Sequence, residues 1–147
     1  MDMSAKEYQA YVKKKQEKSP LWKNMALAFL VGGGICVVGQ LISNGFSAMG
    51  LNTEDSGTAT SVSMVFLSAV FTALGLYHKL ARFAGAGTLV PITGFANSVV
   101  SPAIDFRAEG IITGTAVKMF TVAGPVIVFG TAASVVYGVI LWLMQTL

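Results

Sequence analysis

Charged residues are scarce in this sequence. Asp, Glu, Lys and Arg make up 12% of the 147 residues, whereas hydrophobic residues make up 54%, and the mean hydropathy is +0.67. A soluble globular domain carries about 25% charged residues, so this composition excludes an ordinary soluble domain. The apolar residues form blocks long enough for helices that cross a bilayer, and longer than the strands of an outer-membrane barrel. The composition therefore predicts an all-α integral membrane protein.

Cysteine and histidine are almost absent. Cys36 is the only cysteine and His78 the only histidine, which excludes a disulfide within the chain and a metal site built from these residue types. A Ser-His-Asp arrangement would need His78 together with Asp105, which we expect on opposite sides of the membrane. We therefore expect no catalytic residue, no cofactor and no bound metal, and a protein that is not an enzyme.

Positive charge is concentrated near the N-terminus. Of the ten Lys and Arg residues, six lie in the first 23 positions: Lys6, Lys13, Lys14, Lys15, Lys18 and Lys23. Together with a pI of about 9.1, this distribution points to a membrane surface and to no nucleic-acid partner. Ser4 and Glu7 have the spacing of a capping box, which predicts a helix to about Lys18. Residues 1–23 form a basic cytoplasmic tail, either an amphipathic surface helix or a solvated segment, and residues 24–147 form a polytopic transmembrane domain.

Two apolar runs in the first half predict a transmembrane hairpin. The first runs from Asn24 to about Phe46 and the second from Thr58 to Tyr77, with a polar connection over 45–57 that carries Glu54 and Asp55. The cations lie at the N-terminus and just after the second run. By the positive-inside rule, the N-terminus and the His78 loop are cytoplasmic and the tip of the hairpin is outside.

The last 37 residues, 111–147, contain a single charge, Lys118. As one helix they would be about 55 Å long, which exceeds the thickness of a bilayer. Proline removes a backbone donor and disturbs the preceding turn, so we expect the run to break at Gly124-Pro125. Pro125 to Leu147 then forms the last span, which returns inward, and 110–124 forms a short helix that dips into the membrane.

The segment between these parts, residues 83–100, is apolar but interrupted by glycine and proline. Such segments are typical of broken or re-entrant helices. We favour a crossing over 83–100 with an outer loop at Asp105, Arg107 and Glu109, which gives about four membrane passages. The alternative has 83–124 as two half-helices that enter and leave by the same face.

Lys118 is the most informative polar residue, because a cation halfway along a segment at lipid depth needs a partner or water. It either attracts an anion, or snorkels or pairs with Asp105 or Glu109. Helices that start near Pro91 and Pro125 direct positive dipole ends inward. Further polar residues could line a cavity together with Lys118 or form hydrogen bonds between helices: Gln40, Thr93, Asn97 and Ser98.

Small residues recur at a spacing of four. The sets are Ala28 with Gly32, Ala69 with Ala73, Gly110 with Gly114, and Gly130 with Ser134 and Gly138. Such pairs let helix backbones approach closely in lipid. They predict tight packing either within the chain or between subunits.

Four stretches of the second half resemble sequences of a known family of membrane proteins. They are 85–100 (GAGTLVPITGFANSVV), 101–106 (SPAIDF), Glu109-Gly110 and 120–130 (FTVAGPVIVFG). Over about 83–131 the chain resembles the small SpoVA membrane proteins of endospore-forming bacteria. Its basic N-terminus, the FLVGGG stretch at 29–34 and its length resemble the AC type of that family more than the shorter AE type.

This resemblance implies a function but no catalytic residues. It implies a subunit of the spore inner-membrane complex that moves dipicolinic acid, with calcium, into the forespore and releases it at germination, and a channel opened by membrane tension. The implied partners are other SpoVA subunits, the lipid bilayer, and dipicolinate or its calcium chelate as the transported ligand. About four helices are too few to enclose a pore, so we expect a homo- or hetero-oligomer. An assembly subunit that anchors the others without lining the path is the alternative.

Overall fold

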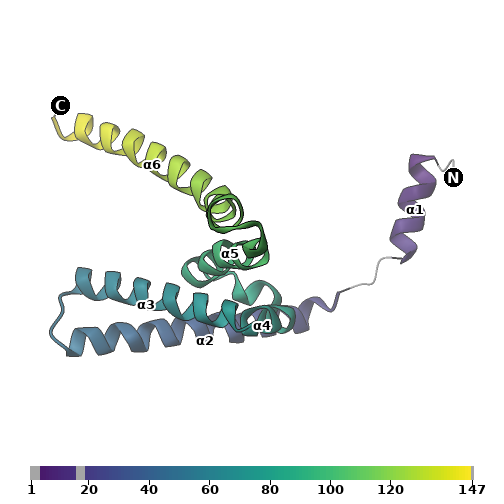
Figure 1. Ribbon diagram of the computed structural model, residues 1–147, viewed down its shortest axis with the longest axis horizontal. Coiled ribbons are helices and arrows are strands. Elements are labelled where there is room, and N and C mark those ends of the chain that lie inside the picture. The colour runs from purple at the N-terminus through teal and green to yellow at the C-terminus, as the bar shows by residue number, and fades with distance from the viewer. Residues whose placement is uncertain (1–3, 16–18, 147) are drawn as a thin grey trace.

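The computed structural model describes residues 4–15 and 19–146, and within these residues every regular element is a helix. Three segments are long and apolar enough to cross a membrane: Leu21–Ala48, Thr53–Ala73 and Ile111–Thr146. In chain order the elements are α1 (Ala5–Lys15), α2 (Leu21–Ala48), α3 (Thr53–Ala73), α4 (Leu76–Ala84), η1 (Gly85–Thr88), α5 (Pro91–Asp105), η2 (Arg107–Glu109), the π-helical η3 (Ile111–Ala116) and α6 (Val117–Thr146). Figure 1 shows α2 and α3 as a long hairpin, with α5 and α6 on one side of it.

The capping box at the start of α1 is confirmed. The Ser4 amide donates to Glu7 Oε2 at 2.9 Å, and the Glu7 amide donates to Ser4 Oγ at 3.4 Å. The hydrogen bond from the Ser4 amide, followed by that from its hydroxyl, lowers the pKa of the Glu7 carboxyl. The expected end of this helix, Lys18, lies outside the described residues.

The α2–α3 hairpin has a shorter connection than predicted. The predicted bounds of the polar connection, 45–57, are wrong, because α2 continues to Ala48 and α3 already begins at Thr53. Asn52 caps α3 by accepting a hydrogen bond from the Asp55 amide at 2.8 Å, which lets the helix begin among polar residues. The hydroxyl of Ser56 donates to the Ser43 carbonyl at 2.9 Å and ties the two helices together near the connection.

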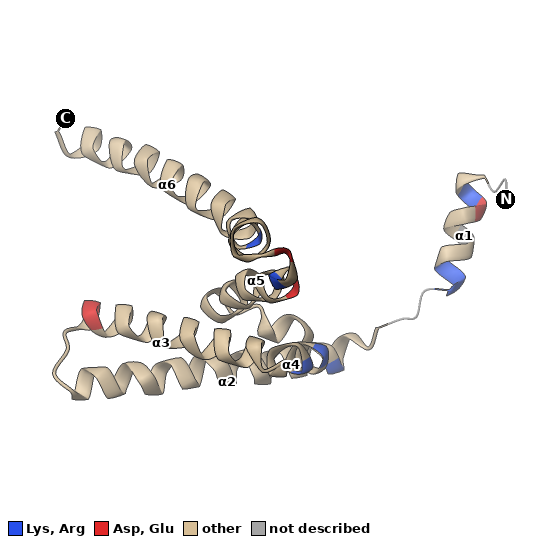
Figure 2. Cartoon of the chain, viewed as in Figure 1, with Lys and Arg blue, Asp and Glu red and all other residues tan. Residues whose placement is uncertain are grey.

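Charge separates along the hairpin (Figure 2). Glu54 and Asp55 lie in the first turn of α3, beside the connection, which we call the acidic end. The other end, which we call the basic end, carries Lys23 at the start of α2 together with Lys79 and Arg82 on α4. Arg82 lies there beside Leu21 and Asn24, around one surface hollow. The charges therefore divide as the sequence predicts.

Helix α3 ends earlier than the predicted Tyr77. It stops at Ala73, and Gly75, at φ +67, turns the chain into α4. Glycine adopts this left-handed conformation at little cost. Tyr77 then lies on α4, where it is 5% exposed and its hydroxyl donates to the Thr88 carbonyl at 2.8 Å.

The η1 segment packs directly on the backbone of α2. A Cβ at Gly87 would lie 2.5 Å from the Ala28 carbonyl oxygen, and one at Gly32 would lie 3.1 Å from the Gly87 carbonyl oxygen. The Ala28/Gly32 pair therefore provides close packing within the chain, one of the two possibilities left open by the sequence. In contrast, a Cβ at Gly130 or Gly138 would meet nothing within 4 Å.

Helix α5 starts at Pro91, as predicted, but continues through Pro102 to Asp105. The expected end at Val100 is wrong, because a proline costs a helix one backbone hydrogen bond and does not prevent the next turn. The Phe106 amide still donates to the Pro102 carbonyl at 3.0 Å. The 15 residues of α5 span about 22 Å, which is too short to cross a hydrocarbon layer of about 30 Å.

Helix α5 runs back toward the basic end. Near its start Thr93 lies beside Ser68, and one turn later Asn97 contacts Thr72. Asp105, at its end, lines a pocket with His78. The preferred crossing with an outer loop at Asp105, Arg107 and Glu109 is therefore wrong, because the turn from α5 to α6 lies at the same end of the hairpin as His78.

The last apolar run does not break at Gly124-Pro125. Residues 111–146 form one continuous helical stretch with Pro125 inside α6, so there is no separate dipping helix over 110–124. A proline within a membrane helix is tolerated with a bend, and Figure 1 shows α6 end-on where it begins and side-on over most of its length. The C-terminal end of α6 lies on the same side of the molecule as the acidic end of the hairpin (Figure 1), whereas a last span returning inward would end on the side of the basic end.

Candidate functional site

A polar stripe runs along one face of α5. It consists of Thr93, Asn97, Ser101 and Asp105, spaced four residues apart. Residues four apart lie on the same face of a helix. The stripe follows the last turns of α3 and reaches from the interior of the hairpin to its basic end.

Hydrogen bonds join this stripe to α3. Ser68 Oγ donates to the Thr93 carbonyl at 2.6 Å, and Thr72 Oγ1 lies 2.9 Å from Asn97 Oδ1. Each such bond between membrane helices contributes about 0.6 kcal/mol. They fix the register between the two helices, so the polar stripe of α5 faces α3 at Thr93 and Asn97.

A polar pocket lies at the basic end of the stripe. It encloses about 240 Å³ and is lined by Thr72, Gly75, His78, Asn97, Ser101, Ile104 and Asp105. His78 is held against its own helix, with Nδ1 2.9 Å from the Gly75 carbonyl oxygen. The lining contains one carboxylate and no lysine or arginine, so most of the polar atoms that the pocket offers to a solute are oxygens.

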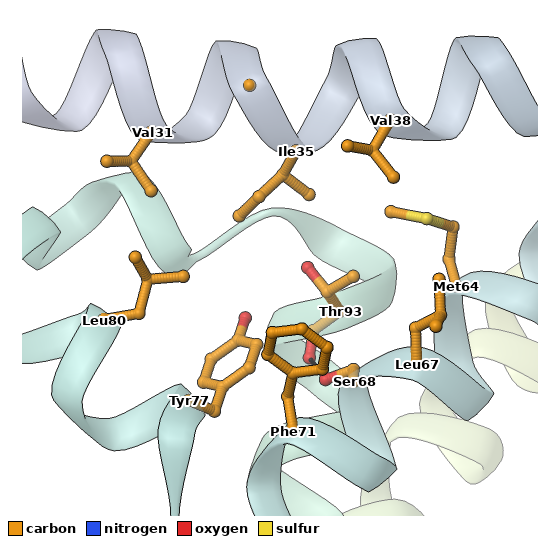
Figure 3. Close-up of a pocket in the computed structure, with 11 residues that line it drawn as sticks. Val31, Ile35, Val38, Met64, Leu67, Ser68, Phe71, Tyr77, Leu80 and Thr93 are labelled. Atoms are coloured by element: carbon orange, nitrogen blue, oxygen red, sulfur yellow. Dashed lines mark hydrogen bonds between the residues drawn. The ribbon is translucent and has the colours of Figure 1, made fainter.

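An apolar pocket lies at the other end of the stripe. It has a volume of about 390 Å³ and is lined by Val31, Gly34, Ile35, Val38, Met64, Leu67, Ser68, Phe71, Tyr77, Leu80 and Thr93. Figure 3 shows Val31, Ile35 and Val38 of α2 facing the side chains of the other helices across it. The α2 residues in this lining lie in the central third of that helix, about 15–26 Å from its start. The apolar pocket therefore lies about midway along α2.

Thr93 marks the boundary between the two regions. It is 5% exposed, it lines the apolar pocket, and its hydroxyl has no hydrogen-bond partner among the described residues. It lies in the first turn of α5, where backbone N–H groups have no partner within the helix and the dipole is positive. The stripe thus ends about midway along α2, at a hydroxyl with no partner among the described residues and at a positive helix end.

The structure does not bring all predicted residues to one cavity. Gln40 is exposed on α2 and donates to Asn44 Oδ1 at 2.8 Å. Ser98 is exposed on α5 and donates to the Phe95 carbonyl, on a different face from the stripe. Pro125 begins no helix, so only Pro91 directs a positive helix end inward.

Lys118 lies near the start of the helical run and not halfway along a segment at lipid depth. Its Nζ is 3.9 Å from the centroid of the Phe106 ring, a cation–π contact. Among the described residues it forms no ion pair with Asp105, exposed at the end of α5, or with Glu109, exposed in η2. The cation therefore lies with Arg107 near the basic end.

Four residues of this region were not among the sequence candidates: Ser68, Thr72, Tyr77 and Ser101. The four-residue spacing of 93, 97, 101 and 105 was visible in the sequence and identifies Ser101. Ser68 and Thr72 had no comparable signal, because hydroxyl residues are common in membrane helices and bond their own backbone.

Comparison with known proteins agrees with the resemblance. Residues 24–140 match a family model described as SpoVAC/SpoVAEB sporulation membrane protein. The chain is 41% identical over 141 residues to stage V sporulation protein AC of Bacillus subtilis (strain 168), covering 95% of this chain and 94% of that protein. No solved structure matches it. The chain therefore belongs to the SpoVAC/SpoVAEB family of sporulation membrane proteins.

Proposed function

We propose that this protein is a channel subunit that passes dipicolinic acid, with calcium, across the forespore membrane during sporulation and germination. Membership of the family supports a role in sporulation at a membrane. The resemblance of residues 83–131 to SpoVA proteins implies that the transported compound is dipicolinic acid. In this proposal the basic end faces the cytoplasm, in accordance with the positive-inside rule.

The observation that carries the proposal is the re-entrant course of residues 85–105. The chain leaves α4 at the basic end, packs on the middle of the hairpin, and returns through α5 to the same end. Irregular backbone at membrane depth is tolerated where it lines a cavity or is buried in protein. Such segments form the selective part of many transport proteins.

The arrangement corresponds to a closed path. A polar solute that follows the stripe from the basic end reaches Thr93 and then meets the apolar pocket. Apolar stretches of a path close channels by excluding water, and in this proposal the apolar pocket is that stretch. In this proposal membrane tension separates α2 from α5 and opens the closure.

One chain does not enclose a pore by itself. With three candidate spans, the path requires further copies or other SpoVA subunits around it. Helix α6 has no buried residue, so most of its surface faces lipid or such partners. That same surface, with the basic α1, supports the second candidate function, an assembly subunit that anchors others without lining the path.

The test is reconstitution of the purified protein in liposomes loaded with dipicolinate. We expect release above that of protein-free liposomes, rising severalfold after an osmotic downshift, because tension opens the closure. A control compound such as trapped sucrose should be retained before the downshift. No release in either condition, alone or with co-expressed SpoVA subunits, would contradict the channel proposal and favour the assembly function.

A further inference from the structure

A surface hollow at the basic end combines one cation with apolar side chains. It has a volume of about 410 Å³ and lies between the start of α2, α4 and η1. Among the described residues Arg82 is the one charged group of its lining, and Asn24 adds an amide. The other lining residues are apolar or small: Leu21, Met25, Ala28, Phe83, Ala84, Gly85 and Ala86. The polar pocket and the apolar pocket have other linings, so the hollow is separate from the proposed path.

The hollow lies at the boundary between lipid headgroups and hydrocarbon. Helix α2 has 28 residues and is about 42 Å long, which matches a bilayer of about 40–45 Å including its headgroup regions. The hydrocarbon layer is about 30 Å thick, so for a symmetric crossing about 6 Å of α2 lies among the headgroups at each end. Leu21 and Asn24 fall within this layer, whereas Ala28 lies about 10 Å from the start of the helix. Trp22 and Lys23 are residue types typical of the same boundary.

We propose that this hollow binds an anionic phospholipid, with the phosphate on Arg82 and an acyl chain along Met25 and Phe83. A guanidinium binds phosphate through two parallel hydrogen bonds. Arg82 is exposed, and the described lining holds no aspartate or glutamate that would compete for it. Met25 and Phe83 are 53% and 63% exposed, so the protein leaves most of their surface to a lipid chain. Lys23 and Lys79 at the same end favour an anionic over a zwitterionic headgroup.

The bound lipid holds the re-entrant segment on α2. Ala28 lines the hollow, and a Cβ at Gly87 would lie 2.5 Å from the Ala28 carbonyl oxygen, so the hollow borders the close contact between η1 and α2. A lipid in the hollow contacts α2, α4 and η1 together. Because a ligand that binds the folded state alone stabilises it, phosphatidylglycerol added in detergent should raise the midpoint of thermal unfolding more than phosphatidylcholine does.

Tryptophan quenching by brominated lipids measures binding at the hollow directly. The chain has two tryptophans: Trp22, next to the lining residue Leu21, and Trp142, near the C-terminal end of α6. Trp142→Phe leaves Trp22 as the reporter, and Trp22→Phe leaves Trp142 as its matched control. Each full-length variant is placed in vesicles of phosphatidylcholine with increasing fractions of phosphatidylglycerol, and the bromine is carried by one lipid or by the other.

We expect phosphatidylglycerol to replace phosphatidylcholine beside Trp22 with a roughly fivefold preference, and beside Trp142 with none. Arg82→Gln should abolish the preference at Trp22, whereas Arg82→Lys should keep part of it. Lys79→Gln removes an equal charge from the same helix but outside the lining, so most of the preference should remain. Equal quenching of Trp22 by the two lipids, or an equal loss in Arg82→Gln and Lys79→Gln, would overturn the site.

A soluble phosphate separates binding of a whole lipid from binding of its headgroup. Glycerol phosphate in excess should leave the preference at Trp22 unchanged, because it lacks the chain that lies along Met25 and Phe83. Loss of the preference in glycerol phosphate would show that the hollow takes the phosphate group alone, and it would contradict the assignment of a phospholipid.

Discussion

Replacing Ile35 by serine is expected to make the proposed channel leak without applied tension. Ile35 projects from the middle of α2 toward Thr93 (Figure 3) and lines the apolar pocket. Exposing a large apolar side chain to water costs about 1.5–3 kcal/mol, and replacing it by serine removes this cost. If that term holds the path dry, dipicolinate release from liposomes before a downshift should rise roughly ten- to hundredfold.

Val37→Ser provides the matched control. Val37 lies two residues away on the same helix, is 59% exposed, and does not line the apolar pocket. It should leave the resting release unchanged. If both variants leak equally, the increase reflects a general loss of helix packing; if neither leaks, the apolar pocket is not the closure.

Adding one methyl group at Gly87 should detach the re-entrant segment from α2. In Gly87→Ala the new Cβ would lie 2.5 Å from the Ala28 carbonyl oxygen and 2.7 Å from Ala28 Cα. These are backbone atoms, so η1 and α2 must move apart. Overpacking of this kind costs about 1–3 kcal/mol, and we expect a lower midpoint of thermal unfolding in detergent together with increased resting release.

Gly33→Ala separates this contact from the general effect of glycine replacement. Gly33 lies on α2, and a Cβ there would meet nothing within 4 Å. Alanine favours a helix over glycine by about 1 kcal/mol, so this variant should be as stable as the parent or more so. A Gly87→Ala protein with an unchanged midpoint would show that η1 does not pack on α2 as described.

The elements that could be predicted from the sequence are those set by local chemistry. Ser4 and Glu7 satisfy amide groups at a helix start regardless of the rest of the fold. The hairpin follows from two apolar runs joined by residues that contain Glu54 and Asp55. Pro91 fits the first turn of a helix, where its missing N–H has no partner in any case.

The prolines inside helices could not be interpreted from sequence alone. Pro102 and Pro125 both lie within helices, although we expected one segment to end at Val100, two residues before Pro102, and another to break at Pro125. The cost of a proline in a helix depends on whether neighbouring groups or a bend accommodate the lost hydrogen bond. That information lies in the tertiary structure.

The position of the α5–α6 turn had no reliable charge signal. Asp105, Arg107 and Glu109 mix both signs, and the positive-inside rule uses an excess of Lys and Arg. The contacts of α5 with α3 decide the question, because they fix the direction in which α5 runs. The interpretation of Lys118 changes for the same reason, because the turn places this residue near the basic end.

The re-entrant course of residues 85–105 is the feature on which the proposed channel most depends, and side-specific labelling tests it directly. Single cysteines are placed in a Cys36→Ser background at Asn52, in the α2–α3 connection, at Arg107, in the α5–α6 turn, and at Met144, near the end of α6. A membrane-impermeant thiol reagent is added to one side of sealed vesicles of known orientation.

We expect Asn52→Cys and Met144→Cys to react from one side and Arg107→Cys from the other. Labelling of Asn52→Cys and Arg107→Cys from the same side would mean that residues 83–105 cross the membrane, and it would contradict the re-entrant path.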